Sequence, residues 1–375
     1  MQPTRRSSAP AGDDAERPVG RRELLAGLGT AAAASLAGCT GGLSGDGGGA
    51  SPTAARPSPG EGGDGAYVPT HRDMMQMIGM QRDGRLVATL SYTVPHQFFL
   101  VTGTRTNQAT IADGDTMHLM VQVMDGETGV VAPGVEPTIE LTKDGEAVGA
   151  NQPWPMLSQS MGFHFGDNVA PSGEGAWRFD VTVNAANGVL STDLADVFTK
   201  RTFSFEREFA PEDAAELGFM GAGGRAGDPG VLAPMSMEMM TVPQQPAFDA
   251  LPIEVTDPQL TDDVAAAVGT HDDPAALGFD GGEAALVVAT QTRYNRYQLG
   301  FMGLRATVTR GGEEVFAGDL SSAVDGGLGH YYGAATPALE AGDEVEVEFV
   351  TPPQVARHVG YETAFLQLEP LTFTL

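Results

Sequence analysis

Histidine and methionine residues recur in two stretches of the sequence in an arrangement that suits a soft metal ion. His118 and Met120 alternate along one predicted strand, and Met156 precedes His164 by eight residues in the other stretch. Thioether and imidazole donors together favour Cu(I), whereas imidazole with oxygen ligands favours Cu(II) or iron. These residue types predict a metal site made by His118, Met120, Met156 and His164. The alternative is that each residue serves packing or lies at the surface.

Alternation along the predicted strands determines how these side chains are presented. In residues 117–124 the odd-numbered positions are apolar and form one face, which leaves His118 and Met120 on the other. If residues 162–166 are extended, Phe163 and Phe165 share one face and His164 points to the opposite one. We therefore expect the aromatic rings to enter a core and both histidines to face away from it.

Short alternating runs separated by turn sequences predict an all-β fold made of antiparallel β-sandwiches. Within residues 177–183, Trp177 and Phe179 begin the clearest inward-facing stripe. A methionine-rich segment, 74–80, is instead compatible with a short helix whose methionines pack. The strands expected in the first half are Leu86–Thr93, Thr116–Met124, Thr138–Thr142, Gly162–Val169, Trp177–Val183 and Thr199–Glu206.

Residues 1–39 have the features of an export signal. The pair Arg21-Arg22 precedes an apolar run, 24–38, which is too short to span a membrane. The twin arginine resembles a Tat signal, and Leu36-Ala37-Gly38-Cys39 resembles a lipobox. This resemblance implies cleavage before Cys39, lipidation of that residue, and an extracytoplasmic location at the cell membrane. An uncleaved anchor is the alternative interpretation.

The rest of the chain divides by composition into a tether, two β-rich regions and a linker. Residues 40–66 are rich in Gly, Ser and Pro and predict a disordered tether. The first sandwich is expected over 67–208, a linker with a methionine cluster over 209–250, and the second sandwich over 251–375. A shift of 166 residues, adjusted to 167 for Lys143–Val148 against Arg310–Val315, pairs His330 with His164 and superposes similar strands, which suggests an internal repeat. Alternation shared by two unrelated sandwiches is the alternative.

Charge and cysteine content narrow the classes of function. The net charge of −28 provides no basic surface for phosphate, so nucleic acid is not expected as a partner. Dispersed acid with two lysines is typical of proteins from high-salt organisms. The single cysteine, Cys39, permits no disulfide within one chain and no thiolate zinc or blue-copper site. Neither a His-Glu-x-x-His nor a Gly-x-Ser-x-Gly motif occurs, so we expect a binding protein and not an enzyme.

Five short motifs follow the order found in one protein family. They are Met117-His118-Leu119, Asp125-Gly-Glu-Thr-Gly129, Pro155-Met156, His164-Phe165-Gly166-Asp-Asn168 and Gly175-Ala-Trp177. Over about residues 84–207 this order resembles the periplasmic metal-binding, iron-transport-associated family, which includes treponemal metal-binding lipoproteins. The resemblance implies an immunoglobulin-like β-sandwich, usually dimeric, that binds copper and handles iron for a membrane permease.

The resemblance assigns metal ligation to individual residues. The family's first histidine corresponds to His118, its methionine after proline to Met156, and its second histidine to His164. Met120 stands where the family has an acidic residue, and replacing a carboxylate by a thioether would increase the preference of the site for Cu(I). A later histidine ligand has no counterpart between residues 165 and 270.

The second region offers candidates for that missing ligand. His358 follows Pro352-Pro353 where the last ligand of the family is expected, and His330 is a further candidate. At the shift of 166, however, the positions of the early ligands hold Ala284, Leu286 and Ser322. The second region is either a degenerate copy kept for packing or one half of a pseudo-dimer that contributes His358. We expect the former, because ligands are lost easily and a shared site requires specific geometry.

Three functions are compatible with these features. The first is an extracytoplasmic lipoprotein that captures copper or iron, or hands it over, for a membrane iron permease. The second is a cell-surface structural or protein-interaction lipoprotein with no metal role. Redox catalysis at copper is the third, and a homodimer is compatible with all of them. The remaining histidines His71, His96 and His271 are expected at the surface or in turns, although His71 and His96 are possible spare ligands.

Overall fold

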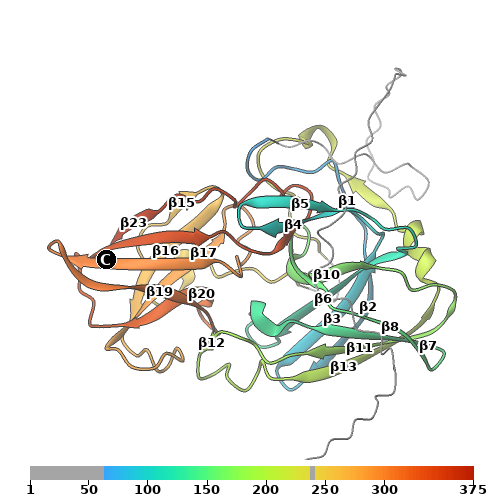
Figure 1. Ribbon diagram of the computed structural model, residues 1–375, viewed down its shortest axis with the longest axis horizontal. Coiled ribbons are helices and arrows are strands. Elements are labelled where there is room, and N and C mark those ends of the chain that lie inside the picture. The colour runs from blue at the N-terminus through green and yellow to red at the C-terminus, as the bar shows by residue number, and fades with distance from the viewer. Residues whose placement is uncertain (1–62, 237–240) are drawn as a thin grey trace, which may run out of the picture. The chain divides into compact units, whose positions relative to one another are not determined.

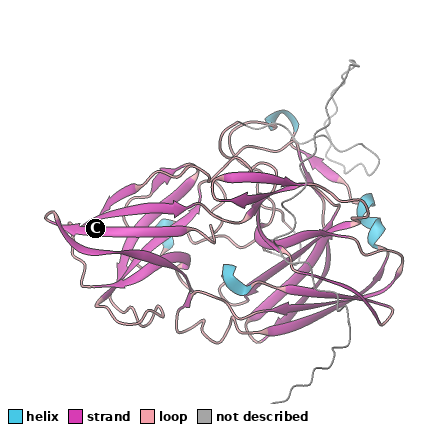
Figure 2. Ribbon diagram, in the orientation of Figure 1, coloured by secondary structure: helices cyan, strands magenta, loops and turns pink. Residues whose placement is uncertain are grey.

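The computed structural model describes residues 63–236 and 241–375, all within one compact unit that spans 48–375. The predicted signal, Cys39 and most of the tether lie outside the described residues, as does part of the methionine cluster at 235–240. Strands dominate the described chain (Figures 1 and 2). Its helical elements are the 3-10 turns η1 (Pro133–Val135), η2 (Pro211–Glu216), η3 (Gly223–Arg225) and η4 (Phe248–Ala250). No helix in the described part is long and apolar enough to cross a membrane.

Two sheets contain most of the strands in the first half of the chain, and nearly all of their strand pairs are antiparallel. The larger sheet has the order β2 (Gln76–Asp83), β3 (Leu86–Thr93), β6 (Met117–Asp125), β10 (Gly162–Val169), β9 (Trp154–Ser158), β22 (Ala356–Arg357), β4 (Phe98–Thr102), β5 (Arg105–Ala109). The smaller sheet has the order β13 (Arg201–Phe209), β11 (Gly175–Val183), β7 (Thr138–Lys143), β8 (Glu146–Asn151). The predicted all-β, antiparallel class is confirmed.

The apolar faces of these two sheets form the main core, as strand alternation predicts. This core includes the stripe that begins at Trp177, the pair Phe163 and Phe165 of β10, and the β6 residues Met117, Leu119, Val121 and Val123. The rings of Phe163 and Phe165 meet edge to face, with centroids 5.4 Å apart. His118 and His164, on the opposite faces of their strands, are therefore directed away from this core.

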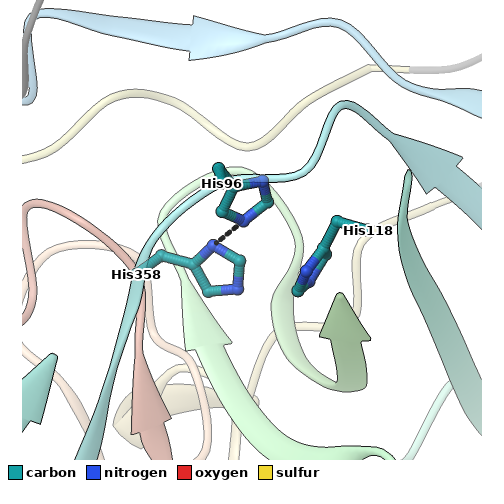
Figure 3. A group of neighbouring side chains, drawn as sticks. All are labelled: His96, His118 and His358. Atoms are coloured by element: carbon teal, nitrogen blue, oxygen red, sulfur yellow. Dashed lines mark hydrogen bonds between the residues drawn. The ribbon is translucent and has the colours of Figure 1, made fainter. Parts of the chain in front are cut away.

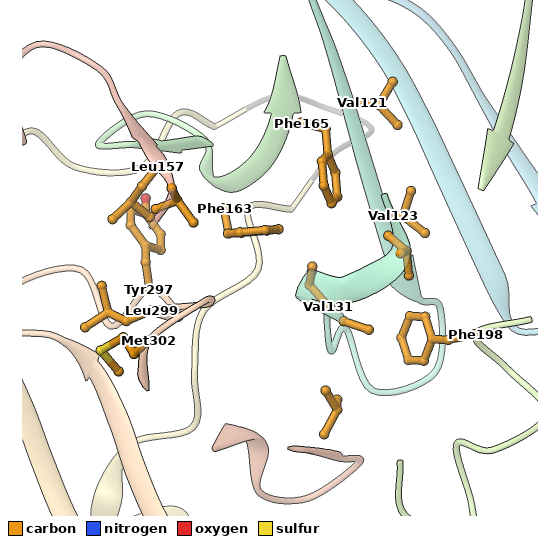
Figure 4. Packing of buried hydrophobic residues seen from close by; sticks show 14 of the residues in the cluster. Val121, Val123, Val131, Leu157, Phe163, Phe165, Phe198, Tyr297, Leu299 and Met302 are labelled. Atoms are coloured by element: carbon orange, nitrogen blue, oxygen red, sulfur yellow. The ribbon is translucent and has the colours of Figure 1, made fainter. Parts of the chain in front are cut away.

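A third sheet contains most of the second half. Its order is β15 (Gln259–Thr261), β16 (Val264–His271), β17 (Ala284–Thr292), β20 (Gly329–Thr336), β19 (Glu313–Asp325), β18 (Gly303–Arg310), β21 (Glu344–Thr351), β23 (Leu371–Thr374), and β12 (Val189–Leu190) pairs with β19. The long strand β19 pairs with β18 through its first part and with β20 through its last. Side chains of this third sheet continue the main core. Leu299 and Met302, which precede β18, belong to the same cluster as Phe163 (Figure 4).

Strand order repeats between the halves, but the register proposed for the strands of His118 and His164 is wrong by one residue. The run β3-β6-β10 corresponds to β16-β17-β20, and β7-β11-β13 corresponds to β18-β21-β23. Val169 pairs with Met117, and Thr336 pairs with Ala284, so both strands are offset by 167 and not by 166. His330 therefore matches Phe163 instead of His164. Because strand side chains alternate, the one-residue difference moves His330 to the opposite face.

The segment at 74–80 forms strands and not the helix that its methionines suggest. The strand β1 (His71–Asp73) pairs with β14 (Phe219–Gly221), and β2 begins at Gln76. Pairing with β3 holds β2 extended, with an irregularity between Met77 and Gly79. This pairing outweighs the intrinsic preference of methionine for helix, which is weak compared with tertiary contacts.

One short strand from the end of the chain enters the sheet of the first half. Ala356 pairs in parallel with Met156 of β9, and Arg357 pairs antiparallel with Phe99 of β4. The next residue donates its backbone N–H to the Leu157 carbonyl at 3.1 Å. That residue is His358, so β22 fixes the position of a histidine beside the strands that carry Met156 and His164.

Candidate metal centre

Four histidine rings converge where β22 meets the sheet of the first half. His118 extends from β6, His164 from β10, His96 from the loop before β4, and His358 from the end of β22. The ring centroid of His358 lies 4.8 Å from that of His96, 5.5 Å from that of His118 and 5.1 Å from that of His164. Figure 3 shows the rings of His96, His118 and His358 turned toward one another. One ligand atom from each of these three lies within 4.8 Å of the others.

Hydrogen bonds fix the tautomers of His118 and His164. The Asn168 side-chain amide donates to the His96 carbonyl at 2.9 Å, so its Oδ1 accepts a hydrogen bond from His118 Nδ1 at 2.9 Å. His164 Nδ1 lies 3.0 Å from the Gly162 carbonyl, which only accepts. Both rings therefore carry their proton on Nδ1 and keep a lone pair on Nε2.

The same reasoning extends to His358 through His96. His96 Nδ1 lies 3.1 Å from the Val94 carbonyl and must donate to it. His96 Nε2 then accepts from His358 Nδ1 across 3.0 Å. This leaves the lone pair of His358 on Nε2. Among the described residues, the Nε2 atoms of His118, His164 and His358 are buried without a hydrogen-bond partner, which is costly unless a ligand satisfies them.

Met156 brings a thioether to the same place. It is fully buried and lies opposite His164 in the pairing of β9 with β10. A Cβ built on Gly166 would lie 3.1 Å from Met156 Sδ and 2.8 Å from His118 Nε2. Both donor atoms thus border the space that a side chain at Gly166 would fill.

Burial keeps these imidazoles neutral. Desolvation lowers the pKa of His164 to about 4, and it lowers the pKa of His118 and His358 well below the ordinary value. The neighbouring imidazoles lower the pKa of all three further, because two positive charges so close together repel each other. At neutral pH the lone pairs are therefore available for a metal ion without prior loss of a proton.

The structure brings together most, but not all, of the residues that the sequence suggests. His118, Met156 and His164 adjoin one another, and His358 joins them, contrary to the expectation of a second region kept only for packing. His96 was expected at the surface and is instead within the cluster, because the turn before β4 carries it over His118 at a centroid distance of 4.2 Å. No spacing in the sequence marks that contact.

The other candidate residues lie elsewhere. His330 is buried, with its Nε2 3.0 Å from Ser322 Oγ and its ring against Tyr332. His271 ends β16, with its Nδ1 3.0 Å from the backbone carbonyl of Asp273. Met120 packs with Met161 and, together with His96 and His358, lines a pocket of about 270 Å³.

Comparison with known proteins gives three results. Residues 249–374 match a family described as a domain of unknown function, DUF7350. None of the curated proteins matches this chain. Among solved structures, FetP of uropathogenic E. coli strain F11, as isolated, is similar with a TM-score of 0.29 and 14% identity over 36% of this chain and 97% of FetP. A copper-bound variant of FetP gives 0.30 and 16% over the same shares.

Proposed function

We propose that this protein is an extracytoplasmic metal-binding lipoprotein that captures copper or iron and hands it over to a membrane uptake system. The observation that supports this most is the set of three buried imidazole nitrogens, each with an unpaired lone pair, beside the Met156 thioether. The lipid anchor and the export route rest on the signal and lipobox patterns of residues 1–39.

Copper fits this donor set better than iron. Imidazole accepts Cu(I) and Cu(II) alike, whereas a thioether favours Cu(I). Within residues 63–236 and 241–375, no carboxylate joins the group formed by His96, His118 and His358, and an oxygen ligand is what would favour iron. A centre of three imidazoles and one thioether would therefore retain copper in both oxidation states.

Hydrogen bonds to the Nδ1 atoms of the three histidines hold these proposed ligands in place. Asn168 orients His118, the Gly162 carbonyl orients His164, and His96 orients His358. Partners of this kind fix the tautomer of a ligand and raise its basicity. His96 and His358 both line the pocket beside the cluster, so that pocket adjoins the proposed centre.

Titration of the full-length chain with Cu(II), and anaerobically with Cu(I) and Fe(II), tests this function. Replacing His118, His164 or His358 by Ala, or Met156 by Leu, should weaken copper binding by at least about ten- to a hundredfold. The variant His271→Ala is the matched control, since His271 ends β16 in the third sheet, outside the cluster, and its loss should leave affinity unchanged.

Retention of copper affinity in all four variants would contradict the proposal. It would favour the alternative function of a structural or protein-interaction lipoprotein. The pair His164→Ala and His358→Ala should also be non-additive, since both rings serve one ion.

A further inference from the structure

A second group of soft donors lies next to the proposed centre. Met120 of β6 and Met161, just before β10, are buried at 2% and 1% exposure and form a cluster with the partly buried Met75 and Met77. We call these four residues the thioether cluster. The main core, by contrast, consists largely of Val, Leu, Ala and aromatic side chains. A cluster made wholly of methionine is therefore unlike the packing elsewhere in the described chain.

The thioether cluster borders the same pocket as the imidazoles. Met75, Met120 and Met161 line the cavity of about 270 Å³, and so do His96 and His358. Met120 also lies two residues from His118 on one face of β6, a separation of about 6.6 Å along a strand. An ion in the pocket would thus meet thioethers and imidazoles on adjoining walls.

We propose that the thioether cluster is a second binding site, selective for Cu(I), from which the ion passes to the imidazole centre. Neutral thioethers bind soft monovalent copper and compete poorly for harder divalent ions. The transfer exchanges ligands and leaves copper as Cu(I), so it requires no electron donor or acceptor. Binding at the cluster stands independently, and only the destination of the ion rests on the proposed function.

The first test uses Ag(I), a redox-inert analogue of Cu(I), and the full-length chain with ¹³C-labelled methionine ε-methyl groups. Ag(I) should shift the ε-methyl resonances of the thioether cluster in the wild-type chain. It should shift them also in a chain that carries His118→Ala and His164→Ala, which removes the imidazole centre. Absence of these shifts, in either protein, would overturn the proposal.

The second test removes the thioethers and keeps their volume. Met120→Leu with Met161→Leu should abolish one equivalent of bound Cu(I) or weaken it at least about tenfold, with Cu(II) affinity at the imidazoles unchanged. Met220→Leu is the matched control, since Met220 is 46% exposed and lies outside the cluster.

The two proposals fail in different ways. Unchanged Cu(I) stoichiometry in the leucine variant means that the methionines only pack, which overturns the second site alone. If the variant His118→Ala with His164→Ala also loses the Cu(I) ion assigned to the thioether cluster, the chain has a single copper site, and the proposal of a second site is overturned as well. Unchanged Cu(II) binding in the imidazole variants contradicts the proposed function and leaves binding at the thioether cluster to be judged by the methyl shifts.

Discussion

A single missing side chain opens the space into which the donor atoms of the proposed centre point. Gly166 lies on β10 two residues after His164, and its backbone needs no left-handed conformation. What the position requires is room, because a Cβ would approach His118 Nε2 to 2.8 Å and Met156 Sδ to 3.1 Å. Such contacts are too close for a methyl group to lie in without displacing both side chains.

Gly166→Ala is therefore expected to impair metal binding more than it impairs folding. The added methyl occupies the space between the imidazole and the thioether, so copper affinity should fall about ten- to a hundredfold. The overpacking itself should cost about 1–3 kcal/mol of stability. Isothermal titration and thermal melting measure the two effects. Gly149→Ala on β8, where a Cβ meets nothing within 4 Å, is the control; equal copper affinity in both variants would contradict the expectation.

At the scale of elements, the two-residue strand β22 determines whether His358 reaches the proposed centre. Its pairing with β9 and β4 inserts the end of the chain between two strands of the first half. Ala356 packs against Phe98 and Met156 in a small apolar cluster of its own. Because little room surrounds Ala356, a larger residue there would displace β22, and His358 with it.

Ala356→Leu should lower stability by about 1–3 kcal/mol through overpacking, and it should weaken copper binding although it removes no ligand. Denaturant unfolding and a copper titration measure these effects. Ala317→Leu on β19 is the matched change at an exposed strand position and should alter neither quantity. Tight copper binding by a destabilised Ala356→Leu chain would show that β22 does not position a ligand.

At the scale of the whole molecule, buried neutral histidines make the metal-free fold sensitive to acid. In the unfolded chain these rings take up protons near pH 6.5, whereas in the folded chain burial lowers the pKa of His164 to about 4 and that of His330 to about 3. The unfolded state therefore binds more protons between those values. Stability is fully present above pH 6.5 and is lost as the pH falls toward 4.

The expected loss from His164 alone is on the order of 3 kcal/mol between pH 6.5 and pH 4. Urea unfolding of the metal-free chain at stepped pH measures it. His164→Gln should flatten the profile partly, because His118, His330 and His358 still contribute. A profile of the metal-free protein that stays level from pH 7 to pH 4 would contradict the neutral, buried state of these rings.

Local alternation was enough to predict the all-β class, the core face of β6, and the outward direction of His118 and His164. The contacts of His96 and His358 depend on a turn and on a strand inserted from 262 residues away, and no local pattern encodes either. The repeat was recognisable, but its register at His330 was not. Consecutive residues 330–332 are all buried, so no alternation between a buried and an exposed face fixed the register of β20, and the one-residue error placed His330 on the wrong face.

The insertion of β22 also has a consequence for the order in which the protein is made. Chains emerge from the ribosome with their N-terminal part first, and domains generally fold as they emerge. A growing chain therefore holds His96, His118, Met156 and His164 long before His358 exists. In the folded protein β22 lies between β9 and β4, so the larger sheet is complete only when that segment is in place. A chain cut before β22 would keep His96, His118, Met156 and His164 but lack His358, and it should bind copper more weakly than the full-length chain.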